Sequence, residues 1–217
     1  GEGQRQVFEA ALARHPSLPA AVSVLAVNNG IDWPAAGETA ALEAVNEGDQ
    51  ALLMYTSGTT GRPKGVVHSQ ASLLAGGWTT ALAHRLSAVD RALCVLPYFH
   101  INGLCVTLMG PLVSGGSVVV AEKFSASRFW QQCGQFEATW CSVVPTIISH
   151  LLHAERAPAK AVVERLRFAR SASSALAPQV QTAFEERFGI AIVETMGLTE
   201  TAAQILANPR PPGLRKV

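Results

Sequence analysis

Short apolar segments alternate with helical patterns along most of the chain, and this alternation limits the fold more than any other feature of the sequence. The patterns predict strands over 51–55, 65–67, 92–96, 118–121, 140–144, 166–169 and 191–194. They predict helices over 70–85, 103–113, 126–136, 146–154 and 178–188. Because the strands are apolar on both faces, they fit a mostly parallel sheet flanked by helices, and the fold class is α/β. Ligands bind such sheets beyond the carboxyl ends of the strands, so we expect a functional site in the loops that follow strands.

The first 48 residues are less regular than the rest of the chain. A weak helical pattern covers 4–14, and a β-branched stretch over 21–27 predicts a strand. A connector rich in Asn, Gly and Pro follows over 28–49, with a short helix predicted at 38–45. We therefore divide the chain into a partial N-terminal segment with its connector, 1–48, and a core, 49–217.

Composition excludes several classes of protein. The 217 residues carry 17 Lys and Arg against 16 Asp and Glu, a formal net charge of +1, which argues against a nucleic-acid binder or a polybasic membrane binder. Charged residues make up only 15% where about 25% is usual, so we expect an interior piece of a larger domain. The chain begins with Gly and carries no signal-peptide pattern, and its four cysteines lack CxxC pairing. These features favour a cytoplasmic protein whose N-terminus lies elsewhere.

A loop over 55–65, YTSGTTGRPKG, directly follows the first predicted core strand and concentrates hydroxyls, glycines and two cations. Glycines let backbone N–H groups approach a ligand, hydroxyls donate to phosphate oxygens, and Arg62 and Lys64 offset phosphate charge. The Walker A pattern fails because Pro63 stands where glycine is required, and the GxGxxG pattern fails for want of a third glycine. A flexible surface turn is the alternative, but it does not explain the clustered cations.

The string TSGTTGRPKGV, over 56–66, closely resembles the phosphate-binding signature of the adenylate-forming superfamily, which includes acyl-CoA synthetases, luciferases and peptide-synthetase adenylation domains. The resemblance implies that this loop holds the β- and γ-phosphates of ATP. The residues assigned to it are Thr56, Ser57, Gly58, Thr59, Thr60, Gly61 and Lys64. It also implies that the chain is part of the large N-terminal domain of an adenylate-forming enzyme.

A second loop, PYFHING over 97–103, resembles the family's aromatic-His-x-x-Gly segment, which borders the carboxylate substrate. The resemblance makes His100 a candidate catalytic residue. A neutral imidazole there could donate a hydrogen bond to a carboxylate without transferring a proton. Taken alone, a single His beside aromatic residues is more often a packed histidine of the core.

A third loop, SASSAL over 171–176, resembles the family's adenine-binding segment, with Ser173, Ser174 and Ala175 as the implied contacts. Small side chains let a flat base lie against the backbone. The segment departs from the family pattern twice, with Ala172 in place of glycine and Ala175 in place of proline. A helix-capping turn before Pro178 is the alternative.

A fourth segment, MGLTET over 196–201, resembles the family's aromatic-Gly-x-Thr-Glu sequence. The resemblance implies that Thr199 contacts the α-phosphate and that Glu200 binds Mg²⁺, which prefers hard oxygen ligands. Met196 replaces the aromatic residue that stacks on adenine, and with Gly197 it completes the implied nucleotide contacts. Without the resemblance, the Thr-Glu pair could simply begin a helix.

Other candidate residues favour structural roles. His150 and His153 lie one helical turn apart without a third ligand, which is typical of a solvated helix face. Trp78, Trp130 and Trp140 fall in predicted elements and are expected in the core. No Gly-x-Ser-x-Gly elbow is present, which removes the simplest hydrolase interpretation.

Together the four segments imply ATP-dependent activation of a small-molecule carboxylic acid to an acyl-adenylate, followed by thioester formation with CoA. The cofactors implied are ATP and Mg²⁺, with CoA as co-substrate. Alternatives are an adenylation domain that loads a carrier protein and a non-catalytic ATP-binding remnant of the fold. The family's small C-terminal domain, with its adenylation lysine, is absent from these 217 residues, so we expect little or no turnover by this chain alone. The acyl substrate and the oligomeric state are left open.

Overall fold

The structure, a computed structural model, describes residues 44–57, 62–210 and 213. Nearly all of them belong to one compact unit, Val45–Val217. The predicted helix over 4–14 and strand over 21–27 lie outside the described residues, as does most of the predicted helix over 38–45. No helix in the described part of the chain is long and apolar enough to cross a membrane.

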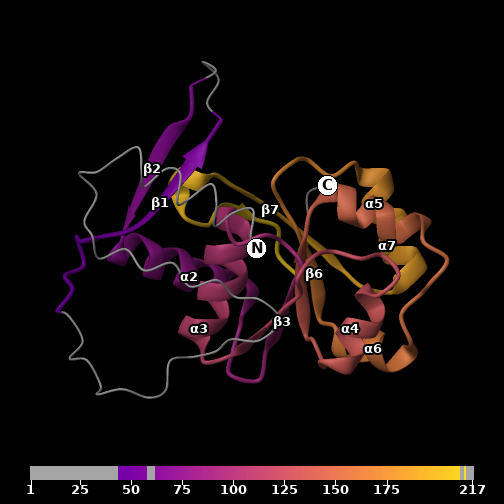
Figure 1. Cartoon of the computed structure of the whole chain (residues 1–217). Coiled ribbons are helices and arrows are strands. Elements are labelled where there is room, and N and C mark those ends of the chain that lie inside the picture. The colour runs from indigo at the N-terminus through magenta and orange to yellow at the C-terminus, as the bar shows by residue number, and fades with distance from the viewer. Residues whose placement is uncertain (1–43, 58–61, 211–212, 214–217) are drawn as a thin grey trace. The chain divides into compact units, whose positions relative to one another are not determined.

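The first two strands of the core form a hairpin of their own. β1 (Gln50–Thr56) pairs antiparallel with β2 (Lys64–Ser69), and Thr56 lies opposite Lys64. We expected both segments to join the mostly parallel sheet, and that expectation is wrong for this pair. The loop between them is shorter than the dozen or more residues that a parallel crossover needs, so the two strands can only fold back on each other. β1 and β2 are therefore the two strands of a hairpin (Figure 1).

The main sheet has six strands in the described residues, in the order β4-β3-β5-β6-β7-β8. They are β3 (Arg91–Cys94), β4 (Ser117–Val120), β5 (Trp140–Val143), β6 (Phe168–Ser171), β7 (Ile192–Gly197) and β8 (Gln204–Ala207). The first five in this spatial order run parallel, and β8 returns antiparallel beside β7. The predicted α/β class with a mostly parallel sheet is confirmed.

Helices cover both faces of this sheet (Figure 1). They are α2 (Gln70–His84), η1 (Asn102–Met109), α3 (Gly110–Ser114), α4 (Phe129–Gln135), α5 (Pro145–His153), α6 (Lys160–Arg165), α7 (Pro178–Phe188) and η2 (Thr199–Thr201). The helix predicted over 103–113 is a π-helix, η1, that continues into the short α3. Neither α6 nor β8 was predicted, because six and four residues are too few to show a period.

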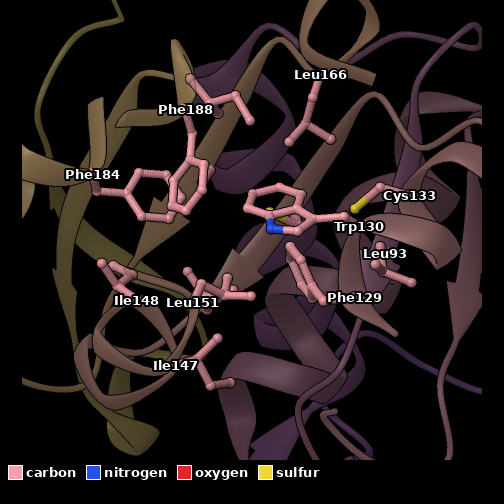
Figure 2. Close-up of a cluster of buried hydrophobic side chains, with 14 of the residues drawn as sticks. Leu93, Phe129, Trp130, Cys133, Ile147, Ile148, Leu151, Leu166, Phe184 and Phe188 are labelled. Atoms are coloured by element: carbon pink, nitrogen blue, oxygen red, sulfur yellow. The ribbon is translucent and has the colours of Figure 1, made fainter. Parts of the chain in front are cut away.

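Alternate residues of the central strands pack into two hydrophobic cores, one on each face of the sheet. Successive side chains of a strand point to opposite faces, so one residue of each adjacent pair packs on each side of the sheet. Leu93, Cys141, Ala169 and Ile192 join the larger cluster with α4 to α7 (Figure 2). Ala92, Trp140, Phe168 and Val193 join the smaller cluster with Val106 of η1. Burial on both faces explains why these strands are mostly apolar in the sequence, with Ser142 of β5 and Arg170 and Ser171 of β6 as buried polar exceptions.

Aromatic rings fill the larger core. Trp130 packs 4.9 Å from Phe129 and 5.0 Å from Phe188, measured between ring centroids (Figure 2). Trp130 and Trp140 are 5% and 0% exposed, as expected for core residues. Trp78 is 51% exposed on α2, so its predicted place in the core is wrong. Its helix packs on η1 through small buried residues, Gly76 against Cys105 and Gly77 against Met109, and the indole is left exposed.

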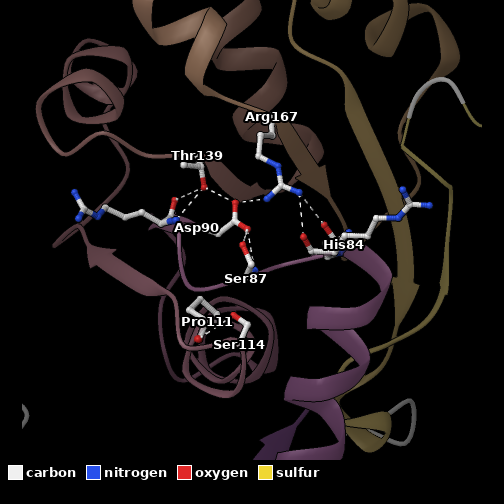
Figure 3. Close-up of polar contacts among 9 residues, drawn as sticks. His84, Ser87, Asp90, Pro111, Ser114, Thr139 and Arg167 are labelled. Atoms are coloured by element: carbon white, nitrogen blue, oxygen red, sulfur yellow. Dashed lines mark hydrogen bonds and ion pairs between the residues drawn. The ribbon is translucent and has the colours of Figure 1, made fainter.

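The amino ends of three neighbouring strands are tied together by Asp90. This buried carboxylate accepts hydrogen bonds from the Ser87 backbone N–H, at 2.9 Å, and the Thr139 hydroxyl, at 2.9 Å, and it forms an ion pair with Arg167 (Figure 3). Burial alone would raise the pKa of Asp90, but the hydrogen bonds from Arg167, Thr139 and Ser87 outweigh it and lower that pKa. Asp90, Thr139 and Arg167 immediately precede β3, β5 and β6. Their contacts therefore hold the amino ends of these strands together, and the functional site is expected at the carboxyl ends.

Candidate functional site

One cleft gathers residues from all four sequence segments that resemble the adenylate-forming signatures. Its volume is about 880 Å³. The hairpin contributes Thr56, Ser57 and Lys64, and the loops at the carboxyl ends of β3, β5, β6 and β7 contribute Leu96, Pro97, His100, Ile101, Asn102, Val144, Ser173, Gly197, Leu198, Thr199 and Glu200. The cleft therefore lies where parallel α/β sheets bind ligands.

The hairpin side of the cleft carries hydroxyls and a cation. Thr56 ends β1 and Lys64 begins β2, and the exposed Ser57 follows Thr56. Hydroxyl donors beside an ammonium group suit the oxygens of a polyphosphate. The predicted phosphate contacts Gly58, Thr59, Thr60 and Gly61 lie outside the described residues.

His68 attaches the hairpin to the turn that carries Thr199 and Glu200. The imidazole is 3% exposed, and its Nε2 donates to the Thr199 carbonyl oxygen at 2.7 Å. Its Nδ1 lies 3.2 Å from the Ser72 hydroxyl, at the start of α2. Sequence analysis missed this residue, because its partner is 131 positions away along the chain. His68 is therefore a positioning residue for this side of the cleft.

The turn after β7 is a three-residue 3₁₀ helix, η2. The Thr201 hydroxyl, which accepts from the Leu198 backbone N–H at 3.0 Å, also lies 2.7 Å from the Ala203 carbonyl oxygen and holds the turn closed. Thr199 and Glu200 are the first two residues of this short helix, as the alternative interpretation of the Thr-Glu pair predicted, and both also line the cleft. A Cβ on Gly197 would lie 2.4 Å from that same Ala203 oxygen, so only glycine fits at this position. Glu200 is exposed and lines the cleft.

A second cleft, of about 810 Å³, continues from the first and shares Ser173, Gly197 and Leu198 with it. It brings together the predicted adenine contacts Ser173, Ser174, Ala175, Met196 and Gly197 with Glu194, Thr195, Leu206, Ala207 and Asn208. Met196 and Leu206 are 50% and 65% exposed and supply apolar surface on which a flat base can lie.

The loop over 171–176 is held by a hydrogen bond to β7. Glu194 of β7 accepts a hydrogen bond from the Leu176 backbone N–H at 2.9 Å. Ser173 takes a positive φ of 77°, which is uncommon for a residue other than glycine. The loop also leads into α7, with Ala177 as its N-cap residue and Pro178 at its start, so the alternative of a turn that begins the helix is left open. Glu194 is a second positioning residue that sequence analysis missed.

His100 faces the cleft and is exposed, so it is not a packed histidine of the core. Its ring centroid lies 4.6 Å from that of Phe99, which is 75% exposed. The turn that presents it is tight, because its backbone N–H donates to the Pro97 carbonyl oxygen at 3.1 Å. A Cβ on Gly103 would lie 2.5 Å from this same oxygen, which explains the glycine at that position.

No group of three His, Cys, Asp or Glu side chains in the described residues could hold a metal ion by itself. His150 and His153 are exposed on α5, as expected from the sequence. The chemistry of the cleft instead fits a cation that takes one carboxylate, Glu200, and completes its ligands with phosphate oxygens and water, as Mg²⁺ commonly does.

Comparison with known proteins identifies a family of enzymes and several relatives. A model of the AMP-binding enzyme family matches residues 5–216. The sulfoacetate–CoA ligase of Cupriavidus necator is 46% identical over 217 residues, which are 100% of this chain and 42% of that protein. The oxalate–CoA ligase of Arabidopsis thaliana is 37% identical over 174 residues, 79% of this chain and 34% of that protein.

One similar solved structure contains a nucleotide and a metal ion. O-Succinylbenzoate coenzyme A synthetase from Bacillus subtilis, in complex with ATP and a magnesium ion, matches with a TM-score of 0.71 and 30% identity, over 81% of this chain and 36% of that one. The chain spans less than half the length of these relatives.

Proposed function

Because this chain belongs to the AMP-binding enzyme family, we propose that the full-length protein activates a carboxylic acid with ATP and transfers the acyl group to CoA. One observation carries this proposal: Lys64, His100 and the adjacent pair Thr199 and Glu200 come from three separate segments of the chain and line a single cleft. The adjoining cleft, with its apolar Met196 surface, has the shape and chemistry for a nucleobase. Relatives that are CoA ligases support CoA as the acceptor in preference to a carrier protein.

The first half-reaction joins two anions, so catalysis there consists mainly of charge neutralisation and alignment. A carboxylate oxygen attacks the α-phosphorus of ATP, and the bond to the β-phosphate breaks to release pyrophosphate. We assign Lys64, with the hydroxyls of Thr56 and Ser57, to the charge of the leaving pyrophosphate. Thr199 donates to the α-phosphate. Gly58, Thr59, Thr60 and Gly61 complete the proposed phosphate loop.

Glu200 is the proposed ligand of Mg²⁺, together with phosphate oxygens. When bound, the ion would offset the charge that develops on the phosphates. The ATP and magnesium complex of a structural neighbour supports this use of both groups. Ser173, Ser174, Ala175, Met196 and Gly197 are the proposed contacts of the adenine ring.

His100 is proposed to orient the substrate carboxylate by donating a hydrogen bond from its imidazole. The CoA thiol then attacks the acyl carbon of the adenylate, the mixed anhydride bond breaks, and AMP leaves.

We propose that residues 49–217 form the nucleotide-binding core and that 1–48 form a partial N-terminal segment and connector. Four buried cysteines, all free in the described residues, support a reducing compartment such as the cytoplasm.

Exchange of labelled pyrophosphate into ATP by the full-length protein tests the first half-reaction without CoA. We expect exchange that requires a carboxylic acid, with short polar acids tested first. Lys64→Met and Glu200→Gln each remove a proposed charge contact and should lower the exchange rate by about 10²- to 10³-fold. Lys160→Met is the matched control, because this 91%-exposed lysine of α6 pairs with Glu164 and does not line the cleft. Exchange that needs no acid, or that survives both cleft variants, would refute the proposal.

A further inference from the structure

Arg170 of β6 is a buried cation that the proposed reaction leaves without a role. Its side chain is 2% exposed, and it takes part in no salt bridge among the described residues. Burial lowers the pKa of the guanidinium to about 9, so it stays charged at neutral pH. A buried charge without a partner of opposite sign is costly for a folded protein. Such a group needs an explanation.

The hydrogen-bond partners of Arg170 are all neutral. Nη1 donates to the Asn102 side-chain oxygen at 2.7 Å and to the Ser142 hydroxyl at 3.1 Å, and Nη2 donates to the Gln204 side-chain oxygen at 3.4 Å. The Nε atom has no partner among the described residues. The positive charge and one donor are therefore left uncompensated by this part of the chain.

Arg170 lines a small cavity beside the cleft. The cavity measures about 30 Å³, more than the roughly 10–15 Å³ that a water-sized group needs. Its lining is Ile101, Asn102, Val106, Arg170, Ala172, Ser173, Gly197, Leu198 and Ala203. Five of these residues, Ile101, Asn102, Ser173, Gly197 and Leu198, also line the 880 Å³ cleft, so the two spaces adjoin. No acidic residue is in this lining.

The orientation of Asn102 presents another donor to the cavity. Its side-chain oxygen is occupied, because it accepts from Arg170 and from the Ser142 hydroxyl at 2.9 Å. The amide nitrogen is consequently at the other end and donates to the Ser173 hydroxyl at 3.3 Å. The polar groups of the cavity are thus a guanidinium, an amide N–H₂ and a hydroxyl. This donor set, with a net positive charge, favours an anion.

We propose that this cavity binds a second anionic group of the substrate, a carboxylate or sulfonate that lies beyond the reacting carboxylate. The enzyme accordingly selects short dianionic acids over monoanionic acids of the same size. The inference rests on the proposed function, since it requires that a carboxylic acid be activated in the adjoining cleft. Arg170 acts in it as a specificity residue that touches the substrate.

The test compares two acids of matched size with the full-length protein. Malonate and propionate differ by one carboxylate in place of a methyl group, and CoA-dependent AMP formation gives kcat/KM for each. We expect the wild type to prefer malonate. Arg170→Gln should lower kcat/KM for malonate on the order of 100-fold and change that for propionate less than about threefold. Arg170→Lys should restore part of the loss, because it keeps the charge without the planar fork.

A second variant tests the same inference if Arg170→Gln does not fold. Gln204→Glu is nearly isosteric, lies in none of the three cavities, and gives Arg170 an internal counter-ion. It should therefore lower the preference for malonate while ATP binding is kept. Arg167→Gln is the matched control, since that arginine also neighbours β6 but already pairs with Asp90. It should leave the malonate to propionate ratio unchanged.

The outcomes separate the two proposals. If propionate and malonate are activated equally, or if Arg170→Gln and Gln204→Glu lower kcat/KM for both acids alike, the second-anion site is refuted and carboxylate activation stands. If the wild type forms no AMP with any carboxylic acid and CoA, the proposed function fails and the specificity inference fails with it.

Discussion

His84, the last residue of α2, makes the stability of this domain sensitive to mild acid. The side chain is 0% exposed and lies against the stacked rings of Trp140 and Phe168, at 6.3 and 5.2 Å between centroids. Neither ring nitrogen has a hydrogen-bond partner among the described residues (Figure 3 shows its place beside Arg167). Burial, and then the charges of Arg170, Arg210 and Arg167, lower the pKa of His84 from 6.5 to about 3.

The free energy of unfolding falls as the pH is lowered because the unfolded chain binds a proton at His84 at a higher pH than the folded chain does. The unfolded chain protonates this imidazole below about pH 6.5, whereas the folded chain resists protonation until its pKa of about 3 is reached. His84 therefore contributes its full stability above pH 6.5 and loses it as the pH falls toward 3. At about 1.4 kcal/mol per pH unit for one proton, the loss between pH 7 and pH 5 is about 2 kcal/mol.

Replacing His84 with Leu isolates this contribution, because Leu is of similar size and suits the aromatic neighbours. Urea unfolding of the full-length protein at pH 7, 6 and 5 gives the free energy of unfolding of both forms. We expect the wild type to lose about 2 kcal/mol more than His84→Leu between pH 7 and 5. Asp90 is present in both proteins, so its contribution to the pH dependence of the free energy of unfolding cancels in the comparison. Equal losses in the two proteins would refute the assignment of a neutral buried His84.

Three further predictions concern the site and the sheet. Gly197→Ala places a methyl group 2.4 Å from a backbone oxygen and should lower both the melting temperature and ATP affinity, whereas Gly48→Ala, with nothing within 4 Å, should change neither in calorimetry. Glu194→Ala removes the acceptor of the Leu176 N–H and should raise the Kd for ATP about tenfold by titration; an unchanged Kd would contradict its positioning role. Asp90→Ala removes the acceptor of the Ser87 N–H and the Thr139 hydroxyl and should cost about 1–3 kcal/mol in urea unfolding, and an unchanged free energy of unfolding would show that this network is not important.

The sequence predicted the parallel strands well because they are buried on both faces. Residues such as Leu93 and Ala92 pack on opposite sides of the sheet, so apolar residues predominate at successive positions of these strands. The same reasoning failed for the hairpin, whose pattern resembles a sheet strand although Leu53 and Val67 are each 52% exposed. Strand direction there was determined by the short loop, which apolar runs do not reveal.

The site could be predicted in part for a different reason. Its loops carry unusual compositions after strands, so the segments around Lys64, His100 and Thr199 were visible in the sequence. His68 and Arg170 were not, because each acts through a partner far along the chain, 131 residues away for His68 and 68 for the bond from Arg170 to Asn102. Only the fold brings these groups together.

The most direct test of the account is AMP formation by the full-length protein with Mg-ATP, a panel of short carboxylic acids, and CoA present or absent. We expect AMP release that requires both an acid and CoA, and that is lost in Lys64→Met and Glu200→Gln. AMP release without CoA, at the same rate, would contradict thioester formation. The absence of any acid-dependent AMP would contradict the assignment of this cleft to carboxylate activation.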